Sequence, residues 1–560
     1  MLSLMKRLQI FAVGLLVGAC SSETPSADPG DGAVEGAVDT GSFDGGPLDS
    51  GPGDPGTCAE PKGRFGAPKT SYELAVNTSD GGLYVKDVVA FLTEKGVDPA
   101  TLDRLYIKAG RYAFVYLGNL PKRERSRPLV ITNKGGQVKI GALRDGYVLS
   151  LQGGSGWVFT GRNDPLSQTG DPGFPGHEGC RYANSRDTYG IVSDDEFKTS
   201  GSFGIGVGTG ATDYELEFLE IRRSGFAGVV LKTDKDPTAT MRNVLVHDLY
   251  VHDTGGEGTY IGSTQFDATK PSGGEHAFEG LRVYRNRFLR TATESFQIGM
   301  LGKDCEVHHN VMALGALGWR FAFQQYQDTG VQYGARYGNQ SFHHNVVVGA
   351  ASLLLNLFPQ PRDGDPHAAS DAVTIADNYF GYGSSGGGYV QNASDKTTTY
   401  RFERNFLGPL TFRYTEVYDG TKPATSFFYV NNTESPVVFE QNQLSGSLAL
   451  VNKETGNVKV SGTVKATLPP PPFRDFMGLP RDVDYRRIEL WGAAATLGKK
   501  GPIAYAKGDY VLYQGELYQL EAATSTNQKP TEHPEAWKHL PLPADDVRLE
   551  PGSPYEGLGL

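Results

Sequence analysis

The sequence predicts an all-β fold, a parallel β-helix solenoid, and two observations lead to this prediction. The first is a short repeat in which an apolar residue, two further residues, Asn or Asp, one residue and a second apolar residue follow one another. Its polar centres are Asp248, Asn286, Asn310, Asn345, Asn378, Asn405 and Asn442. The second is the composition, since 73 glycines, 28 Phe and 28 Tyr in 560 residues favour strands joined by many turns.

The repeat keeps its local pattern while its length varies. The interval from Asn286 to Asn310 is much shorter than the interval from Asp248 to Asn286. A constant corner at a variable period indicates one corner per coil, with loops of varied length elsewhere. We expect the Asn side chains to stack as a ladder in which each amide bonds the neighbouring coils. An antiparallel sandwich is the alternative fold, and it leaves the Asn corner unexplained.

The chain between about residues 100 and 450 resembles the right-handed parallel β-helix proteins of the pectate-lyase-like fold. Its ends agree with this resemblance. Residues 84–95 have the periodicity of an amphipathic helix that would cap the first coil. Residues 105–117 and 128–140 look like first coils. The resemblance implies a β-helix with its N-terminal cap over residues 66–500 and a closing segment over residues 544–560.

The first residues predict export and a lipid anchor. Lys6 and Arg7 precede an apolar run, Leu8 to Val17, that is too short to span a bilayer comfortably. The residues up to Cys20 (VGAC) then resemble the lipobox of bacterial lipoproteins. This resemblance implies a signal peptide over residues 1–19, a lipid on Cys20 and a location at the outer membrane or cell surface. An ordinary signal peptide with a chance cysteine is the alternative.

Residues 20–65 predict an extended tether. Eight acids and no Lys or Arg stand between residues 21 and 57, among Gly, Pro, Ser, Ala and Thr, so this segment cannot bury a core. The acids lack the regular spacing of a calcium-binding loop. The net charge of the whole chain, -11, argues against nucleic acid as a partner.

Three cysteines follow Cys20. An exported protein can form disulfides, and Cys58 and Cys180 could pair because both lie in turn-rich sequence. Cys305 stands five residues before Asn310, where other coils carry an apolar residue. We therefore expect Cys305 to be a buried and inert thiol.

The candidate site consists of polar columns on consecutive coils. An alignment of residues 219–232, 249–262 and 287–299 places Arg222, His252 and Arg290 in one column. A second column holds Glu257 and Glu294. Basic groups stacked at steps of about 4.8 Å repel one another unless an anion lies over them, and a uronic-acid polymer would supply that charge. The alternative is a row of ion pairs with neighbouring acids such as Asp253.

Relatives of the resembled fold include polysaccharide lyases, uronate epimerases and glycoside hydrolases. In a lyase acting by β-elimination, Arg290 would neutralise the uronate carboxylate and His252 would be the base. Glu257 and Glu294 would then be calcium ligands, or instead the acid pair of a hydrolase. The expected function is to bind and degrade a polysaccharide. A non-catalytic glycan-binding adhesin is the competing class.

Two further motifs carry histidine. The segment 363–367 (DGDPH) resembles the Asp-Pro-His motif of alginate epimerases and makes Asp365 and His367 a second candidate site, although Ala368 follows where an acid is usual. Paired histidines stand at 308–309 and 343–344, just before two of the Asn corners. Neighbouring coils carry Arg or Asp there, so we expect these pairs to be structural rather than metal ligands.

A small second module is predicted over residues 501–543. Its pattern of Tyr, Gly-Asp and a later Trp-Lys resembles the chitin- and cellulose-binding modules of bacterial glycosidases. The resemblance implies a sugar-binding face of flat rings, carried by Tyr505, Tyr513, Tyr518 and Trp537. The Trp pair usual in that family is missing at residues 520–523. The alternative is that these rings form the core of a very small domain.

Overall fold

The structure is a computed structural model. It describes residues 62–141, 146–177, 182, 185–198, 201–233, 239–264, 276–318, 327–362, 364–391, 396–411, 424–431, 434–492, 504–541 and 544–560. Cys20, Cys58, Cys180, the predicted signal peptide and most of the predicted tether lie outside these residues. Within the described part of the chain, no helix has the length and hydropathy needed to cross a membrane.

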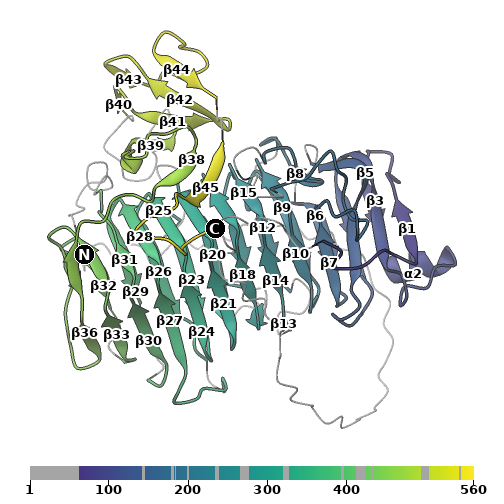
Figure 1. Ribbon diagram of the computed structural model, residues 1–560, viewed down its shortest axis with the longest axis horizontal. Helices are drawn as coiled ribbons and strands as arrows, with labels where there is room; N and C mark the ends of the chain where they lie inside the picture. The colour runs from purple at the N-terminus through teal and green to yellow at the C-terminus, as the bar shows by residue number, and fades with distance from the viewer. Residues whose placement is uncertain are drawn as a thin grey trace, which may run out of the picture. The chain divides into compact units, whose positions relative to one another are not determined.

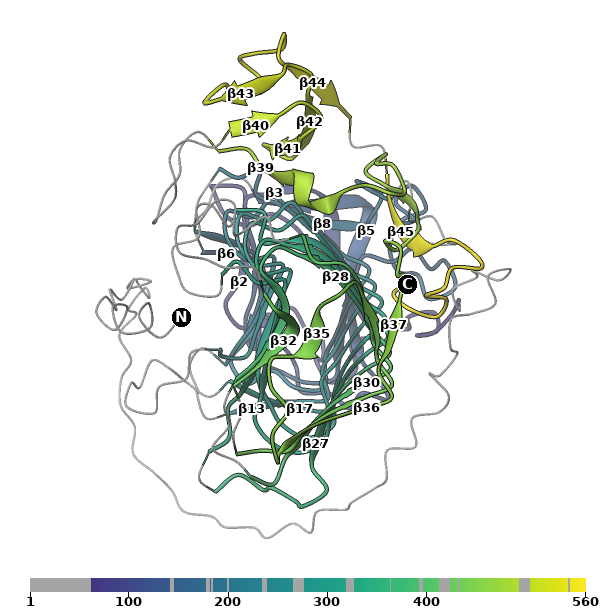
Figure 2. The ribbon, with the colours of Figure 1, turned by 90° about the vertical axis from the view of Figure 1, so that its left-hand side faces the viewer.

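Two long parallel sheets dominate the described residues, sheet A with 23 strands and sheet B with 14 (Figure 1). Each strand pairs in parallel with its counterparts one coil earlier and one coil later. For example, Ile221 pairs with Val251, and Val251 pairs with Phe288. Figure 2 looks along this stack and shows strands of the two sheets on different sides of one interior. The predicted right-handed parallel β-helix is thereby confirmed.

Sheet A consists of β1 (Ser71–Leu74), β3 (Arg104–Tyr112), β5 (Leu129–Ile140), β7 (Trp157–Thr160), β8 (Ile191–Asp194), β10 (Glu215–Glu217), β11 (Glu220–Arg222), β14 (Leu245–His247), β15 (Tyr250–His252), β18 (Arg282–Tyr284), β19 (Arg287–Leu289), β21 (Cys305–His308), β22 (Val311–Gly315), β24 (Gln340–His343), β25 (Val346–Ala350), β27 (Ala372–Ala376), β28 (Tyr379–Gly383), β30 (Thr399–Glu403), β31 (Phe406–Leu407), β33 (Val437–Glu440), β34 (Gln443–Ser445), β36 (Val458–Ser461) and β37 (Val464–Ala466). Sheet B consists of β2 (Leu83–Val85), β4 (Val115–Leu117), β6 (Gly146–Gln152), β9 (Ser202–Gly208), β12 (Val229–Leu231), β13 (Thr240–Arg242), β16 (Thr259–Ile261), β17 (Ala277–Glu279), β20 (Phe296–Leu301), β23 (Val331–Ala335), β26 (Leu353–Pro359), β29 (Gly386–Val390), β32 (Ser426–Val430) and β35 (Ala449–Val451).

The predicted asparagine ladder is present from Asn286 to Asn442. From Asn310 onward, the side-chain oxygen of each Asn accepts from the backbone N–H and the amide of the Asn one coil earlier. Asn345 Oδ1, for example, lies 3.0 Å from the backbone nitrogen of Asn310 and 2.9 Å from its Nδ2. The residue before each Asn has φ between 51° and 55°, so a tight left-handed corner sets the side chain into the stack.

Asp248 does not belong to this ladder, which corrects the sequence alignment by one residue. His247 pairs with Tyr284, so Leu249, not Asp248, lies opposite Asn286, and Leu249 N donates to Asn286 Oδ1 at 2.9 Å. Asp248 has φ 54° and occupies the left-handed corner itself. A polar residue followed by an apolar one fits either register, so the local pattern could not separate the two.

Inward-facing Val, Ile, Leu and Phe fill the coils and form one continuous core cluster. At its first end lies α2 (Val88–Glu94), whose first turn is capped by Asp87 accepting from Ala90 N at 2.8 Å. This confirms the predicted cap helix, although Tyr84 belongs to strand β2 instead. Cys305 is a buried free thiol within the core, as expected, and burial raises its pKa to about 12.

After sheet A ends, β38 (Phe473–Phe476) pairs antiparallel with β45 (Asp545–Leu549). Between these two strands lie the 3-10 turn η2 (Tyr485–Arg487) and a small four-stranded sheet of β39 (Ile488–Leu490), β41 (Tyr510–Tyr513), β42 (Glu516–Leu520) and β44 (Trp537–Leu540). Strands β40 (Ala504–Ala506) and β43 (Thr524–Thr526) form a second pair. The four-stranded sheet therefore includes β39, which lies before the predicted boundary at residue 501.

Candidate functional site

The structure brings the predicted basic residues together, with one correction to their register. Arg222 pairs with His252 on adjacent strands, as expected. His252, however, pairs with Leu289 on β19, and Arg290 shares the next, left-handed corner position with Asp253. The error is the same one-residue shift that misplaced Asp248.

Each predicted basic residue is paired with acids and buried; together with those acids, they form what we call the sheet A network. Its members are Asp187, Asp194, Glu220, Arg222, His252, Asp253, Arg290 and Asp545. Arg290 Nε lies 2.7 Å from Asp253 Oδ1, and its NH1 lies 2.7 Å from Asp545 Oδ1. His252 lies 2.6 Å from Asp253 through Nδ1 and 3.1 Å from Glu220 through Nε2.

Arg222 closes the other end of the network. It lies 2.9 Å from Glu220, 3.0 Å from Asp194 and 2.5 Å from Asp187.

Burial alone would raise the pKa of Asp253, but the charge of Arg290 and the hydrogen bond from His252 outweigh it and hold that pKa well below its usual range. The network therefore matches the ion-pair alternative, and through Asp545 it fixes the closing strand β45 against sheet A.

The second predicted column behaves differently. Gly258 N donates to the Glu294 carbonyl, and Tyr260 pairs with Gln297, so Glu257 and Glu294 lie in register one coil apart, as expected. We call these two residues the acid pair. Both side chains are buried, and Gln332 donates a short hydrogen bond to Glu294 Oε1. Among the described residues, Oε2 of each carboxyl group has no hydrogen-bond partner.

The acid pair has the electrostatics of two like groups in a dry site. Burial raises the pKa of Glu257 to about 7, against the opposing charge of Lys232. Burial and then the neighbouring Glu257 raise the pKa of Glu294 well above its ordinary value. At neutral pH the pair therefore holds a proton, which is the condition under which a carboxylic acid can act as a proton donor.

A column of polar and aromatic side chains continues from the acid pair along the outer face of sheet B. Register places these residues on consecutive strands: Tyr260, Gln297, Gln332, Asn356, Tyr389 and Tyr429. We call them the sheet B column. Their chain neighbours, such as Ile261 and Ile298, point into the core. An alignment of the sheet B strands by their alternating apolar residues would have revealed this column from the sequence.

Hydrogen bonds hold the amides of the sheet B column in place. Gln297 Nε2 donates to Thr264 at 2.7 Å, and Gln391 Nε2 donates to Asn356 at 2.9 Å. The ammonium of Lys232 lies 3.3 Å from the centre of the Tyr260 ring. The side chains of Gln297, Gln332 and Asn356 are buried. Exposure then rises from Asn356 to Tyr429, which is 43% exposed.

The alternative site at Asp365 and His367 is held by an arginine. Asp365 is bound by Arg336 at 2.7 Å and accepts from Arg362 N at 2.9 Å. His367 Nε2 lies 4.0 Å from Asp365 Oδ2. Asp365 thus fixes the start of the loop after β26, and His367 is the more accessible of the two.

A further carboxylate cluster was not foreseen from the sequence. Glu215, Glu217 and His247 lie close enough together to hold a metal ion. In this structure the guanidinium of Arg64 lies 2.5 Å from Glu215 and 3.0 Å from Glu217, so a cation from the chain itself occupies this cluster. The alternation of acids on β10 was visible in the sequence, but its partner Arg64 was not.

The predicted sugar-binding rings lie mostly inside their module. Tyr505, Tyr518 and Trp537 belong to its core cluster, and Trp537 Nε1 donates to the Gln528 carbonyl at 3.1 Å. Tyr513 is half-buried and packs edge to face against Trp491 at 5.4 Å. The three buried rings thus form the core of the module, and the half-buried rings of Tyr513 and Trp491 are more accessible than they are.

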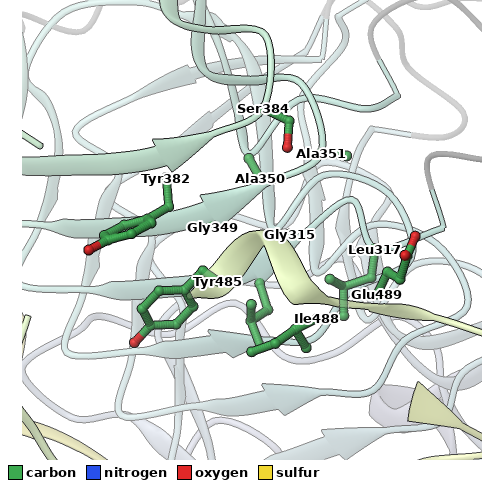
Figure 3. A pocket seen from close by; sticks show the side chains of 11 residues that line it. Gly315, Leu317, Gly349, Ala350, Ala351, Tyr382, Ser384, Tyr485, Ile488 and Glu489 are labelled. Atoms are coloured by element: carbon green, nitrogen blue, oxygen red, sulfur yellow. The ribbon is translucent and has the colours of Figure 1, made fainter. Parts of the chain in front are cut away.

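A small pocket lies where the coils meet the segment after sheet A. Its lining includes the rings of Tyr382 and Tyr485, whose centres are 5.1 Å apart, and residues of β22 and β25 (Figure 3). Its volume is about 20 Å³, enough for about one water molecule and too small for a sugar ring.

A comparison of the sequence with protein-family models and with curated proteins finds no match. Solved structures are similar at low identity. An alginate lyase from Paenibacillus sp. strain FPU-7 is 14% identical, with a TM-score of 0.36 over 63% of this chain and 91% of the other. A GH136 lacto-N-biosidase from Eubacterium ramulus is 9% identical, with a TM-score of 0.40 over 71% of this chain and 68% of the other. A periplasmic alginate epimerase is 9% identical, with a TM-score of 0.34 over 65% of this chain and 77% of the other.

Proposed function

We propose that this chain binds a polysaccharide along the sheet B column and hydrolyses it at the acid pair. The observation that supports this proposal is that two buried glutamates stand in register on adjacent coils, both with raised pKa values. Paired carboxyl groups of this kind are the machinery of glycoside hydrolases.

The spacing of the acid pair suggests a retaining reaction. Adjacent coils in register are about 4.8 Å apart, close to the separation of about 5–5.5 Å that retaining hydrolases use, and shorter than the 6.5–9.5 Å of inverting enzymes. Glu294, whose pKa is raised by burial and by the neighbouring Glu257, would protonate the leaving oxygen. Glu257, next to the positive charge of Lys232, is the better nucleophile because that charge favours its ionised form.

The sheet B column supplies what a glycan needs along its length. Tyrosine faces pack against sugar rings, and amides exchange hydrogen bonds with hydroxyl groups. Column members Tyr389 and Tyr429 lie on successive coils, with ring centres 5.7 Å apart. A polymer lying along the solenoid at this end would therefore meet an accessible ring at Tyr389 and again at Tyr429.

The sheet A network supports a lyase less well. A lyase needs an available base and an available cation at the uronate. His252 is engaged by carboxylates at both ring nitrogens, and Arg290 is engaged by Asp253 and Asp545. For these residues to reach a substrate, strand β45 would have to move away.

The test is a screen of the purified protein against neutral and uronic polysaccharides, with Glu257→Gln, Glu294→Gln and the control Glu306→Gln. Glu306 is half-buried on the outer side of sheet A, so its variant carries the same chemical change away from the acid pair. We expect new reducing ends from the wild type and the control, and a loss of at least about a hundredfold in both acid-pair variants. Unsaturated uronate products, or full activity in both variants, would contradict the proposal.

The same screen separates the remaining alternatives. Binding without turnover on any polymer would favour a non-catalytic adhesin. If calcium bridges Glu257 and Glu294, a chelator would abolish activity and added Ca²⁺ would restore it. A hydrolase that works by the acid pair alone would keep its rate in the chelator.

We further propose that Cys20 carries a lipid that anchors the protein at the bacterial outer membrane or cell surface, supported by the lipobox-like sequence before it. Fatty-acid labelling of the wild type but not of Cys20→Ala would support this.

For the C-terminal module we propose glycan binding through Tyr513 and Trp491. Tyr513→Ala should weaken retention on insoluble glycan, whereas Trp537→Ala should unfold the module.

A further inference from the structure

Four histidines form a two-by-two array at the ladder corners of sheet A: His308, His309, His343 and His344. We call this set the histidine array. Within each coil the two Nδ1 atoms face each other at 2.9 Å. Between coils the rings are stacked, with centres 5.0 Å apart for His308 and His343 and 4.9 Å apart for His309 and His344. All four side chains are half-buried, so solvent reaches them.

The backbone fixes this arrangement. His308 and His343 are paired residues on β21 and β24. His309 and His344 follow at the left-handed corners, with φ of 53° and 54°. The ladder residues Asn310 and Asn345 come next and tie the two corners together. The array is therefore held in position before any ligand arrives.

The nitrogen separation matches a particular coordination geometry. Two metal–nitrogen bonds of about 2.05 Å at a right angle place their nitrogens about 2.9 Å apart, whereas a tetrahedral angle places them about 3.3 Å apart. Right angles belong to the tetragonal and square-planar geometries of Cu²⁺ and Ni²⁺, which also favour imidazole ligands. The 2.9 Å separation equally suits a hydrogen bond, so the geometry must be tested with the metal.

We propose that the histidine array is a Cu²⁺ or Ni²⁺ site, in which the two Nδ1 atoms of one coil chelate one ion. Without metal, one proton lies between these two nitrogens. On binding, that proton moves to Nε2 of the same ring, so both rings become Nε2–H tautomers and no net proton is released. The second coil offers a second, weaker site, because two dications about 5 Å apart repel each other.

The charge around the array does not prevent binding. The nearby guanidinium of Arg285 lies 2.6 Å from Asp248, and that of Arg282 lies 3.7 Å from Glu306. Each neighbouring cation thus has an acid beside it.

The experiment titrates Cu²⁺ into the untagged full chain, followed by calorimetry and electron paramagnetic resonance. The test variant is His309→Asn with His344→Asn, since Asn tolerates the left-handed corner. The control is His533→Asn with His539→Asn, which removes two exposed histidines elsewhere. Melting curves check that both variants fold.

For the wild type and the control we expect a first Cu²⁺ ion with nitrogen coupling from two ligands, and magnetic coupling between two ions at higher occupancy. The test variant should lose at least about tenfold in affinity. Equal Cu²⁺ binding by all three proteins, or no binding by the wild type up to about millimolar metal, would overturn the proposal. This inference does not rest on the proposed hydrolase.

Discussion

The sheet A network and the acid pair stand at the two ends of one turn, between His252 and Glu257, yet their chemistry is opposite. In the network every buried charge faces an opposite charge, as Arg290 faces Asp253 and Asp545. In the acid pair two like groups face each other, and burial raises both pKa values. Stacking on consecutive coils is common to both, so stacking alone does not mark a functional site.

The difference lies in what each cluster does for folding. A buried, fully paired network costs a great deal when one partner is removed, and it fixes the elements that it joins. A buried pair of acids gains nothing comparable for the fold, because one of them must stay protonated. Groups kept in such a state are candidates for chemistry, which is why the acid pair supports the proposed function and the network does not.

The largest expected effect is on the network. Arg290→Met leaves Asp253 and Asp545 buried without their main cation, so it should lower the free energy of unfolding by roughly 3–5 kcal/mol. Arg404→Met is the control, because Arg404 forms an exposed pair with Asp377 and should cost less than about 1 kcal/mol. Chemical denaturation measures both. If both variants lose the same small amount of unfolding free energy, the ion pairs of Arg290 do not stabilise the fold and Arg290 is again a candidate catalytic residue.

A smaller loss is expected at the neutral asparagine ladder. Asn310→Ala removes the hydrogen bonds that the Asn310 side-chain amide donates to Asn345 Oδ1 and to the Val283 carbonyl, and it should cost roughly 1–3 kcal/mol. Asn310→Leu should be at least as destabilising, because it adds bulk at a tight corner. Thermal melting of both variants provides the check, and melting like the wild type would contradict the ladder's energetic role.

The contribution of the acid pair to folding stability should change with pH in the direction opposite to that of the network. The folded-state pKa of Glu294 is raised, so its contribution to stability is present below about pH 4.5 and is lost as pH rises through the folded pKa. Glu294→Gln cannot ionise, so it should be more stable relative to the wild type at pH 8 than at pH 5.

The pKa values of Asp253 and Asp545 are lowered, so their contribution is present above about pH 4 and is lost on further acidification. Denaturation curves at pH 3, 5 and 8 would test both signs. A wild-type protein that loses no stability below pH 4 would contradict the assignment of the network.

The smallest effect on stability is expected at the exposed end of the sheet B column. Tyr429→Ala removes a ring that is 43% exposed, so the free energy of unfolding should change by less than about 0.5 kcal/mol. Glycan affinity should fall by roughly 0.5–1.5 kcal/mol, since a sugar-stacking face is lost. Isothermal calorimetry with a bound oligosaccharide separates the two effects. Unchanged affinity would move the substrate path away from this column.

Much of the fold could be predicted from the chain alone. The Asn corner marks one turn per coil because a buried amide needs hydrogen-bond partners, which the next Asn and the backbone of the adjoining coil supply, and the corner itself is a local pattern in the sequence. The buried thiol of Cys305 followed from its position before an Asn corner, and the cap helix near Val88 followed from the helical periodicity of residues 84–95. The register beside Asp248 did not, because a shift of one residue leaves a comparable pattern of polar and apolar side chains.

The sequence could list the charged columns, but only the tertiary structure decided which charges are paired. Arg290 meets Asp545, which lies far along the chain on β45, and Glu215 meets Arg64 from the segment before the first coil. Such contacts depend on which distant segment packs against the coil, and the coil's own residues carry no signal of it. Whether a stacked side chain serves structure or chemistry therefore depends on partners that the fold brings from elsewhere.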